Sequence, residues 1–194
     1  MRLWFRLILF LLITPFRKKL ESPTGPSILK YRVHLTDIDT NVHLNNGQYL
    51  TFMDLGRLDL LARTGLWRPV LKHKWMPVVS GAAIRFRREL RLFEPFILES
   101  NMVYWNDETA VMEQRFRFIK GKRSGAIAAT ALVRVGLYDR SQRQFVPMSR
   151  LMEETGHFVP QPELKEHIRA FLESEEQIKY HDRQDPSAQT ASAA

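Results

Sequence analysis

The sequence contains no cysteine among its 194 residues. Disulfide bonds, thiolate metal sites and a cysteine nucleophile are therefore excluded. Acidic residues are in the minority: 21 Asp and Glu stand against 29 Lys and Arg, which gives a formal net charge of +8. Such a charge favours an anionic partner, such as nucleic acid, a phospholipid surface or a phosphate-bearing small molecule. Because no nucleic-acid-binding motif is present, we expect no nucleic acid among the partners.

A long hydrophobic run is also absent. Residues 3–16 are apolar except for Arg6 and Thr14, whereas a helix that spans a bilayer needs about 20 apolar residues. Three interpretations of segment 1–19 remain open. It is a membrane anchor held by its flanking basic residues, an uncleaved export signal, or an apolar helix packed on its own domain or on a dimer partner. We expect the protein at the cytoplasmic face of a membrane or in the cytoplasm.

The length and an apolar content of 44% predict one domain with a core. Residues 20–28 are rich in Pro, Ser and Gly and predict a linker. Residues 30–36 alternate with period two, which predicts a strand. From Asn46 the apolar residues follow helical spacing up to Gly65, a typical helix stop, and Asn45 or Asn46 is the expected N-cap.

Four further runs have strand character, and short polar turns separate several of them. They cover residues 78–89, 96–105, 109–119 and 125–138. In the first run, the alternation predicts that Val78, Ser80, Ala82, Ile84 and Phe86 share one face of the sheet. One strand, one long helix and four antiparallel strands make an α+β domain over residues 29–160. Residues 147–155 predict a short helix, residues 161–180 a C-terminal helix, and residues 181–194 a disordered tail.

The segment between the first strand and the long helix carries the chemistry. Six of its thirteen residues, positions 37–49, are Asp, Asn or His. The carboxylate, amide and imidazole of Asp39, Asn41 and His43 can act on one reacting centre. Such a set supplies a nucleophile or a base that activates water, and donors for a developing oxyanion. Asp and Asn before a helix also serve as plain caps and turns, so a purely structural role is the alternative.

The segment resembles the signature of the hotdog-fold thioesterases, of the 4-hydroxybenzoyl-CoA thioesterase-like and acyl-ACP thioesterase superfamily. The residues that carry the resemblance are Asp37-Ile38-Asp39, His43-Leu44-Asn45-Asn46 and Tyr49. With the apolar N-terminus and Leu92-Phe93-Glu94-Pro95-Phe96, the layout is similar to the thioesterase superfamily member 6 group. The resemblance implies a single hotdog domain, a five-stranded antiparallel sheet around one long helix, and a homodimer or dimer of dimers.

The resemblance assigns catalysis to Asp39, as nucleophile or general base, together with Asn41 and His43. The plant acyl-ACP enzymes add a downstream Cys, which this chain lacks. We expect Asp37 to be structural. The candidate substrate-binding residues comprise two at the helix start, one in the shared motif, one acid on the helix, and two basic residues for the phosphates of coenzyme A. They are Asn46, Gly47, Tyr49, Asp54, Arg85 and Arg87.

We therefore expect hydrolysis of acyl-CoA or acyl-ACP, with no cofactor beyond the carrier in the substrate and no metal, since His43 and the nearby acids lack ligand spacing. The alternative is a non-catalytic hotdog protein that binds acyl thioesters or lipids at a membrane. A hotdog hydratase generally pairs a His with a Glu on the helix, and residues 47–63 contain Asp54 and Asp59 but no Glu.

Overall fold

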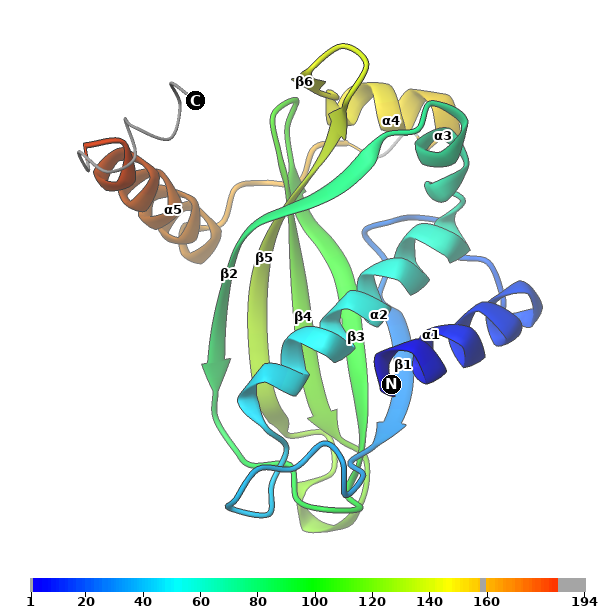
Figure 1. Ribbon diagram of the computed structural model, residues 1–194, viewed down its shortest axis with the longest axis vertical. Helices are drawn as coiled ribbons and strands as arrows, with labels where there is room; N and C mark the ends of the chain where they lie inside the picture. The colour runs from blue at the N-terminus through cyan, green and yellow to red at the C-terminus, as the bar shows by residue number, and fades with distance from the viewer. Residues whose placement is uncertain (1, 158–159, 185–194) are drawn as a thin grey trace.

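The computed structural model describes the backbone of residues 2–157 and 160–184, with side chains from residue 6 onward. A curled antiparallel sheet wraps around one long helix, as Figure 1 shows. The strands run in the order β1-β3-β4-β5-β2, and β6 pairs with β5. The strands are β1 (Ser27–Arg32), β2 (Met76–Phe86), β3 (Pro95–Trp105), β4 (Ala110–Phe118), β5 (Ile127–Asp139) and β6 (Gln144–Phe145). The helices are α1 (Arg2–Ile13), α2 (Asn46–Thr64), α3 (Trp67–Lys72), α4 (Met148–Thr155) and α5 (Glu166–Gln184), with 3-10 turns η1 (Thr14–Phe16) and η2 (Gly121–Arg123).

Helix α2 begins and ends where the sequence predicts. The Asn45 side chain accepts a hydrogen bond from the Gly47 amide at 2.8 Å, so Asn45 and not Asn46 is the N-cap. Gly65 ends the helix in the left-handed region at φ 80°, a conformation that glycine adopts without steric cost. The capping residues therefore set both ends of the element that the sheet encloses.

The core lies between α2 and the concave face of the sheet. Phe52 and Met53 of α2 are fully buried and pack into one cluster with Phe96 of β3 and Phe116 of β4. Along β3 every second residue is buried; Phe96 and Leu98 face the core, whereas Tyr104, which follows a register shift after Met102, packs against α5 on the outer face. Burial of such large side chains contributes about 1.5–3 kcal/mol each relative to exposure.

The first strand differs from the prediction of residues 30–36. It covers Ser27–Arg32, so the last two residues of the predicted linker 20–28 belong to the sheet. The chain leaves the strand early because a turn forms: the Asp37 amide donates to the His34 carbonyl at 2.8 Å, and the Asp37 carboxylate accepts from the His34 amide at 3.0 Å.

The sheet also differs in two details from the predicted five strands. Among the described residues it has six, since the two-residue β6 forms a hairpin with β5. In β2 the register shifts between Val79 and Gly81. A bulge reverses the alternation, so the prediction that Val78 and Ser80 share a face with Ile84 is wrong. Helix α3, which has Pro69 in its first turn, was not expected.

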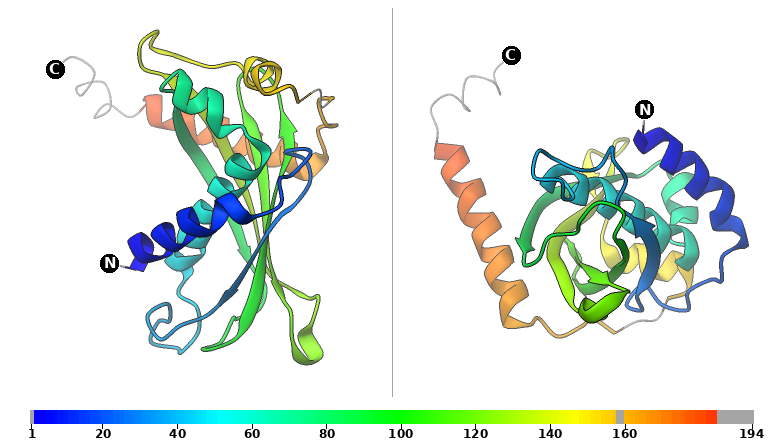
Figure 2. Two further views of the ribbon diagram at one scale, coloured as in Figure 1. Left: turned by 90° about the vertical axis from the view of Figure 1, so that its right-hand side faces the viewer. Right: turned by 90° about the horizontal axis from the view of Figure 1, so that it is seen from below.

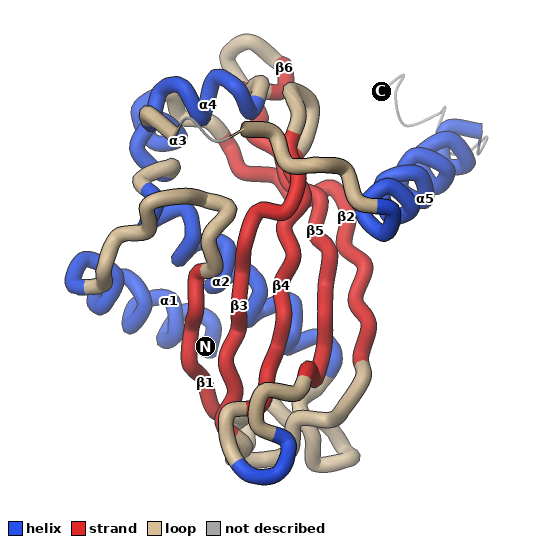
Figure 3. Tube along the Cα trace, turned by 180° about the vertical axis from the view of Figure 1, so that it is seen from behind, coloured by secondary structure: helices blue, strands red, loops and turns tan. Residues whose placement is uncertain are grey.

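Helix α5 starts later and extends further than the predicted 161–180. It covers Glu166–Gln184, so residues 181–184 of the predicted disordered tail are helical, and 185–194 lie outside the described residues. Ile168 and Phe171 pack on Tyr104 and Val111, on the outer face of the sheet. Figure 3 shows α5 on the side of β5 and β2, far from α1.

Helix α1 lies at the opposite side of the sheet, next to β1 and α2 (Figure 2). Two of the three interpretations of segment 1–19, the membrane anchor and the export signal, involve a membrane. In the part of the chain that the structure describes, no helix combines the length and the apolar character required to span a bilayer.

Candidate active site

The Asp/Asn/His segment forms a tight loop at the end of the sheet, just before α2. The Val42 amide donates to the Asp39 carbonyl at 3.1 Å, and the Asp39 amide donates to the His43 carbonyl at 3.0 Å. Val42 has φ 61°, which is uncommon for a β-branched residue and indicates local strain. Ile38 and Leu44 pair across the loop as an isolated bridge. The loop therefore holds Asp39, Asn41 and His43 together.

The Asp39 carboxylate is supported on both oxygens. Its Oδ1 accepts a hydrogen bond from the Asn41 amide at 2.9 Å, and its Oδ2 lies 3.3 Å from His43 Nδ1. The Asp39 and His43 side chains are 22% and 27% exposed. Asn41 thus contacts Asp39 through its backbone. The carboxylate is oriented by neighbours and still reachable from solvent, as a nucleophile or base requires.

Asp37 is fully buried below this loop, where it serves structure as expected. Its carboxylate accepts from the His34 amide, and its carbonyl accepts from the Asn45 amide at 2.9 Å. Arg6 of α1 donates to Asp37 Oδ2 at 2.6 Å and lies over the Phe52 ring, 4.5 Å from its centroid. The N-terminal helix is therefore joined by an ion pair to the loop that carries Asp39.

The residues at the start of α2 divide into exposed and core positions. Asn46 and Gly47 are exposed beside the loop, and the Gly47 amide is used by the Asn45 cap. The Asn46 amide has no acceptor among the described residues. Tyr49 is 2% exposed, and its ring packs 5.0 Å from the Phe86 ring and 4.7 Å from the Phe116 ring, centroid to centroid. Burial raises the pKa of Tyr49 to about 12, so it is a neutral core residue in this chain.

Asp54 stands apart from the Asp39 loop. It is eight residues into α2, about 12 Å along the helix axis from Asn46 at 1.5 Å per residue. Its carboxylate pairs with Arg57, which also donates to Gln114 Oε1 at 2.8 Å. Burial lowers the pKa of Arg57 despite this partner. Asp54 therefore already has an ionic partner within the helix.

Arg85 and Arg87 lie at the end of β2, on either side of Phe86, whose ring contacts Tyr49 of α2; by alternation along the strand their side chains face away from α2. Both side chains are exposed, and neither has a hydrogen bond or ion pair with another described residue. Among the described residues these two cations therefore have no side-chain partner, while Arg88 donates to the Ile127 carbonyl at 3.1 Å.

Sequence reasoning missed the residues that fasten the loop from outside. The segment after β2 pairs with it: His43 bridges to Arg91, and the Leu44 amide donates to the Leu90 carbonyl at 2.8 Å. Arg91 in turn donates to Glu89 at 2.7 Å, and this hydrogen bond lowers the pKa of Glu89. No motif signals this pairing, because two irregular segments about fifty positions apart meet only in the folded chain.

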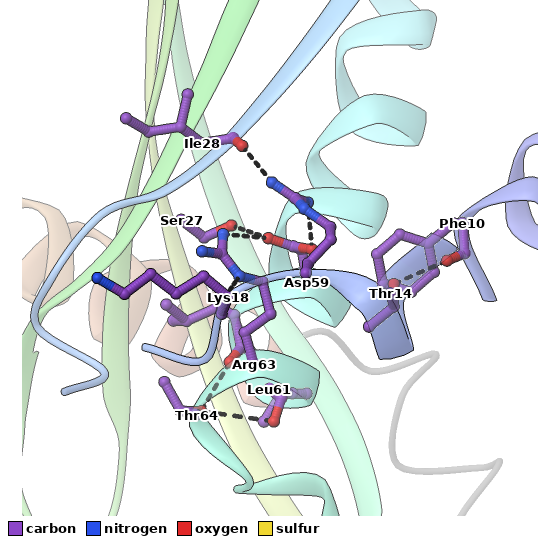
Figure 4. A network of polar contacts seen from close by, with 11 residues as sticks. Phe10, Thr14, Lys18, Ser27, Ile28, Asp59, Leu61, Arg63 and Thr64 are labelled. Atoms are coloured by element: carbon purple, nitrogen blue, oxygen red, sulfur yellow. Dashed lines mark hydrogen bonds and ion pairs between the residues drawn. The ribbon is translucent and has the colours of Figure 1, made fainter. Parts of the chain in front are cut away.

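A second buried carboxylate ties the chain before β1 to α2. Asp59 of α2 is fully buried and accepts hydrogen bonds from Arg17 at 2.5 Å, Ser27 at 2.5 Å and Arg63 at 3.2 Å. Figure 4 shows Ser27 and Arg63 on either side of the strand–helix contact, with their side chains directed to Asp59. Arg17 also donates to the Ile28 carbonyl at 2.7 Å. A buried charge needs such compensation, so this network sets how η1 and β1 sit on the helix.

A family model described as the thioesterase-like superfamily matches residues 33–168, more than half of the chain. The chain belongs to the thioesterase-like superfamily. Protein THEM6 of Danio rerio is 34% identical over 119 residues, which cover 61% of this chain and 57% of that protein. Protein THEM6 of Xenopus laevis is 36% identical over 84 residues, covering 43% and 41%. The chain thus matches only about half the length of these relatives.

Solved structures of thioesterases share the fold. The YbaW probable thioesterase from Escherichia coli superposes with a TM-score of 0.61 at 21% identity, covering 67% of this chain and 96% of that one. A 1,4-dihydroxy-2-naphthoyl-CoA thioesterase from Synechocystis superposes with a TM-score of 0.58 at 12% identity, covering 71% and 100%. The predicted hotdog fold is therefore confirmed, and at these identities the likeness concerns the fold alone.

The described residues contain no cluster of three or more His, Asp or Glu side chains that could hold a metal ion. What the loop offers is a carboxylate, an adjacent imidazole and a helix N-terminus. A carboxylate can attack a carbonyl carbon or deprotonate water, and a helix N-terminus favours negative charge that develops nearby. Acyl transfer requires a nucleophile or base of this kind and a group that stabilises the developing negative charge.

Proposed function

We propose that the protein hydrolyses acyl thioesters carried by coenzyme A or by acyl carrier protein, with Asp39 as nucleophile or general base. The observation that carries the proposal is the Asp39 carboxylate, which lies in the loop before α2, is oriented by the Asn41 amide and is 3.3 Å from His43. Membership of the thioesterase-like superfamily supports the reaction class.

Two routes use these groups. In one, Asp39 takes a proton from water, the hydroxide attacks the thioester carbonyl carbon, the C–S bond breaks, and the thiolate is protonated as it leaves. In the other, the carboxylate itself attacks the carbonyl carbon, the C–S bond breaks and the thiolate leaves with a proton, and water then hydrolyses the resulting anhydride to free acid and the Asp39 carboxyl group. His43 stabilises or protonates the departing group in either route, and the Asn46 amide is the donor that faces the developing oxyanion.

The carrier is proposed from charge. Arg85 and Arg87 are exposed, lack ionic partners among the described residues, and lie at the end of β2. Guanidinium groups bind phosphate through charge-assisted hydrogen bonds. Both coenzyme A and the prosthetic arm of acyl carrier protein bear phosphate, so these arginines hold the carrier outside the loop.

We also propose a homodimer that completes the site. Strand β2 is an edge strand paired only with β5 among the described residues, and such an edge is a template for another strand. The Arg87 amide donates to the Ala128 carbonyl at 2.8 Å. By alternation along the strand, the amides of Ile84 and Ala82 point to the free edge. We expect Ala82→Pro to shift the protein from dimer to monomer in light scattering while Ala83→Pro disrupts the β5 pairing. A dimer unaffected by Ala82→Pro would refute this interface.

A membrane surface is the proposed location. The outer side of α1 exposes Ile8, Leu11 and Leu12, and Phe16 of η1 is 90% exposed. Arg17, Lys18 and Lys19 follow directly. An apolar face with adjacent cations binds the interface of an anionic bilayer. We expect sedimentation with phosphatidylserine vesicles, and loss of it in Leu11→Asp/Leu12→Asp but not in the control Ile178→Asp on α5. Equal sedimentation of both variants would exclude α1 as the contact.

Thiol release from a panel of short, medium, long and aromatic acyl-CoAs, and from acyl carrier protein loaded with the same acyl groups, tests the reaction. The chain has no cysteine, so a thiol reagent meets no protein background. We expect turnover that falls at least about a hundredfold in Asp39→Asn, and a higher KM with little change in kcat in Arg85→Ala/Arg87→Ala. Folded wild type that binds the acyl thioesters without releasing thiol would instead support the non-catalytic binding protein.

A further inference from the structure

A cavity of about 650 Å³ lies between α1 and β1, at the edge of the sheet opposite β2. Figure 1 shows the two elements that enclose it, and Figure 2 shows α1 standing outside the sheet at this edge. Leu9, Phe10 and Ile13 of α1 line one wall, and Leu29 of β1 belongs to the other. The volume falls in the usual range for sites that hold small organic ligands. Asp39, Asn41 and His43 do not line it, so it is separate from the proposed active site.

Cations surround this apolar space. Arg6, Arg17 and Lys30 line the cavity together with the ring of His34, and no acidic residue does. Arg6 and Arg17 are partly neutralised by Asp37 and Asp59. Lys30 has no ionic partner among the described residues, and Arg6 Nη1 is buried without a hydrogen-bond acceptor there. A buried donor without a partner costs free energy unless a ligand supplies the acceptor.

Helix α1 is apolar on both sides, which a helix that only packs on its own domain does not require. Leu9 and Ile13 line the cavity and are 46% and 48% exposed, so the cavity is open to solvent on this side, while Leu11 and Leu12 are exposed and do not line it. The inner side therefore presents hydrocarbon to a space that the described residues leave empty of side chains. Aliphatic walls with a cationic rim match one class of ligand: an alkyl chain that ends in an anion.

We propose that this cavity binds a single-chain lipid with an anionic head group, its hydrocarbon between α1 and β1 and its head at Arg6 and Lys30. A fatty acid carboxylate and the phosphate of a lysophospholipid share this chemistry. The ligand contacts both α1 and the sheet. Through the ion pair of Arg6 with Asp37 it is connected to the loop that carries Asp39. The binding site does not depend on thioester hydrolysis.

Calorimetric titration of the full chain with dodecanoate, dodecyl phosphate and dodecanol tests the proposal. We expect dodecanol to bind at least about tenfold more weakly than the better of the two anions, because it cannot form a charge-assisted hydrogen bond with Arg6 or Lys30. Tighter binding of dodecanoate indicates a fatty acid, and tighter binding of dodecyl phosphate indicates a phosphate-headed lipid. Equal affinity for all three, or no binding of either anion, would overturn the proposal.

Variants locate the site. Ile13→Trp fills the cavity and is expected to abolish binding, whereas Leu12→Trp, an exposed neighbour that does not line it, retains binding. Lys30→Ala is expected to weaken the anions about tenfold and dodecanol hardly at all, with Lys19→Ala as the charge-matched control. Asp39→Ala is expected to keep full affinity. Binding lost in Asp39→Ala but kept in the folded Ile13→Trp and Lys30→Ala proteins would place the lipid in the thioesterase site and refute the α1–β1 site.

Discussion

Replacement of Gly56 by alanine probes the close approach of α2 to the sheet. A Cβ at this position would overlap the Ser100 hydroxyl and would lie 2.8 Å from Gln114 Nε2 and 2.9 Å from Leu98 Cδ2. All three neighbours are fully buried. Gln114 Nε2 donates to Ser100 Oγ at 2.8 Å and to the Met53 carbonyl at 3.0 Å. The neighbours cannot withdraw without breaking this network.

The magnitude follows from three terms. Overpacking of a filled core costs about 1–3 kcal/mol, and loss of one hydrogen bond of Gln114 costs about 1 kcal/mol more. The gain in helix propensity from Gly to Ala offsets about 1 kcal/mol. We therefore expect Gly56→Ala to lower the free energy of unfolding by about 2 kcal/mol, which lowers the Tm by about 4–8 °C in a protein of this length.

Urea unfolding and calorimetry measure the effect, and a double-mutant cycle assigns it. Ser100→Ala removes the hydroxyl that the new methyl group would overlap. The double variant should therefore be less destabilised than the sum of the two single variants, by at least about 1 kcal/mol. A Gly56→Ala protein as stable as the wild type, or strictly additive variants, would refute the reasoning from close packing.

Three further predictions concern the cap and two titrating groups. Asn45→Ala should cost about 1 kcal/mol in urea unfolding, since the Gly47 amide loses its acceptor, and unchanged stability would contradict the capping role. Because burial raises the pKa of Tyr49 to about 12, its contribution to the free energy of unfolding is complete below the ordinary tyrosine pKa and is lost as the pH rises through 12. Alkaline absorbance titration should therefore lose a step near pH 12 in Tyr49→Phe, and identical curves would exclude it. The hydrogen bond from His73 lowers the pKa of Glu154. The ionised Glu154 therefore contributes to the free energy of unfolding above the ordinary glutamate pKa, and this contribution is lost as the pH falls below it. Glu154→Gln should flatten the acid limb of the stability profile, measured by thermal unfolding from pH 7 to 3, and an unaltered limb would speak against the pair.

Local patterns predicted the elements that surround the site. The change from period two to helical spacing at Asn46, the asparagine cap and Gly65 located α2 within a residue at each end. The Asn106-Asp107-Glu108 turn is likewise formed by side-chain bonds inside the segment, because Asn106 Oδ1 accepts from the Glu108 and Thr109 amides. Such interactions join residues that are neighbours in the chain, so they can be predicted from the sequence.

Predictions failed where distant residues decide the local structure. The first strand ends at Arg32 because Asp37 turns the chain. In β2 a bulge, not the residue pattern, sets which side chains share a face. The alternation of residues in a strand sequence does not reveal a register shift against the partner strand.

The sequence by itself determined the α+β order of elements, the ends of α2 and the grouping of Asp39, Asn41 and His43 within five positions, because these depend on residues near one another. Only the tertiary structure decided the pairing of Arg6 with Asp37, the gathering of Arg17, Ser27 and Arg63 around Asp59, and the cavity between α1 and β1. Each of these joins segments far apart in the chain. A buried carboxylate requires a cation, and the folded backbone alone settles which arginine can reach it.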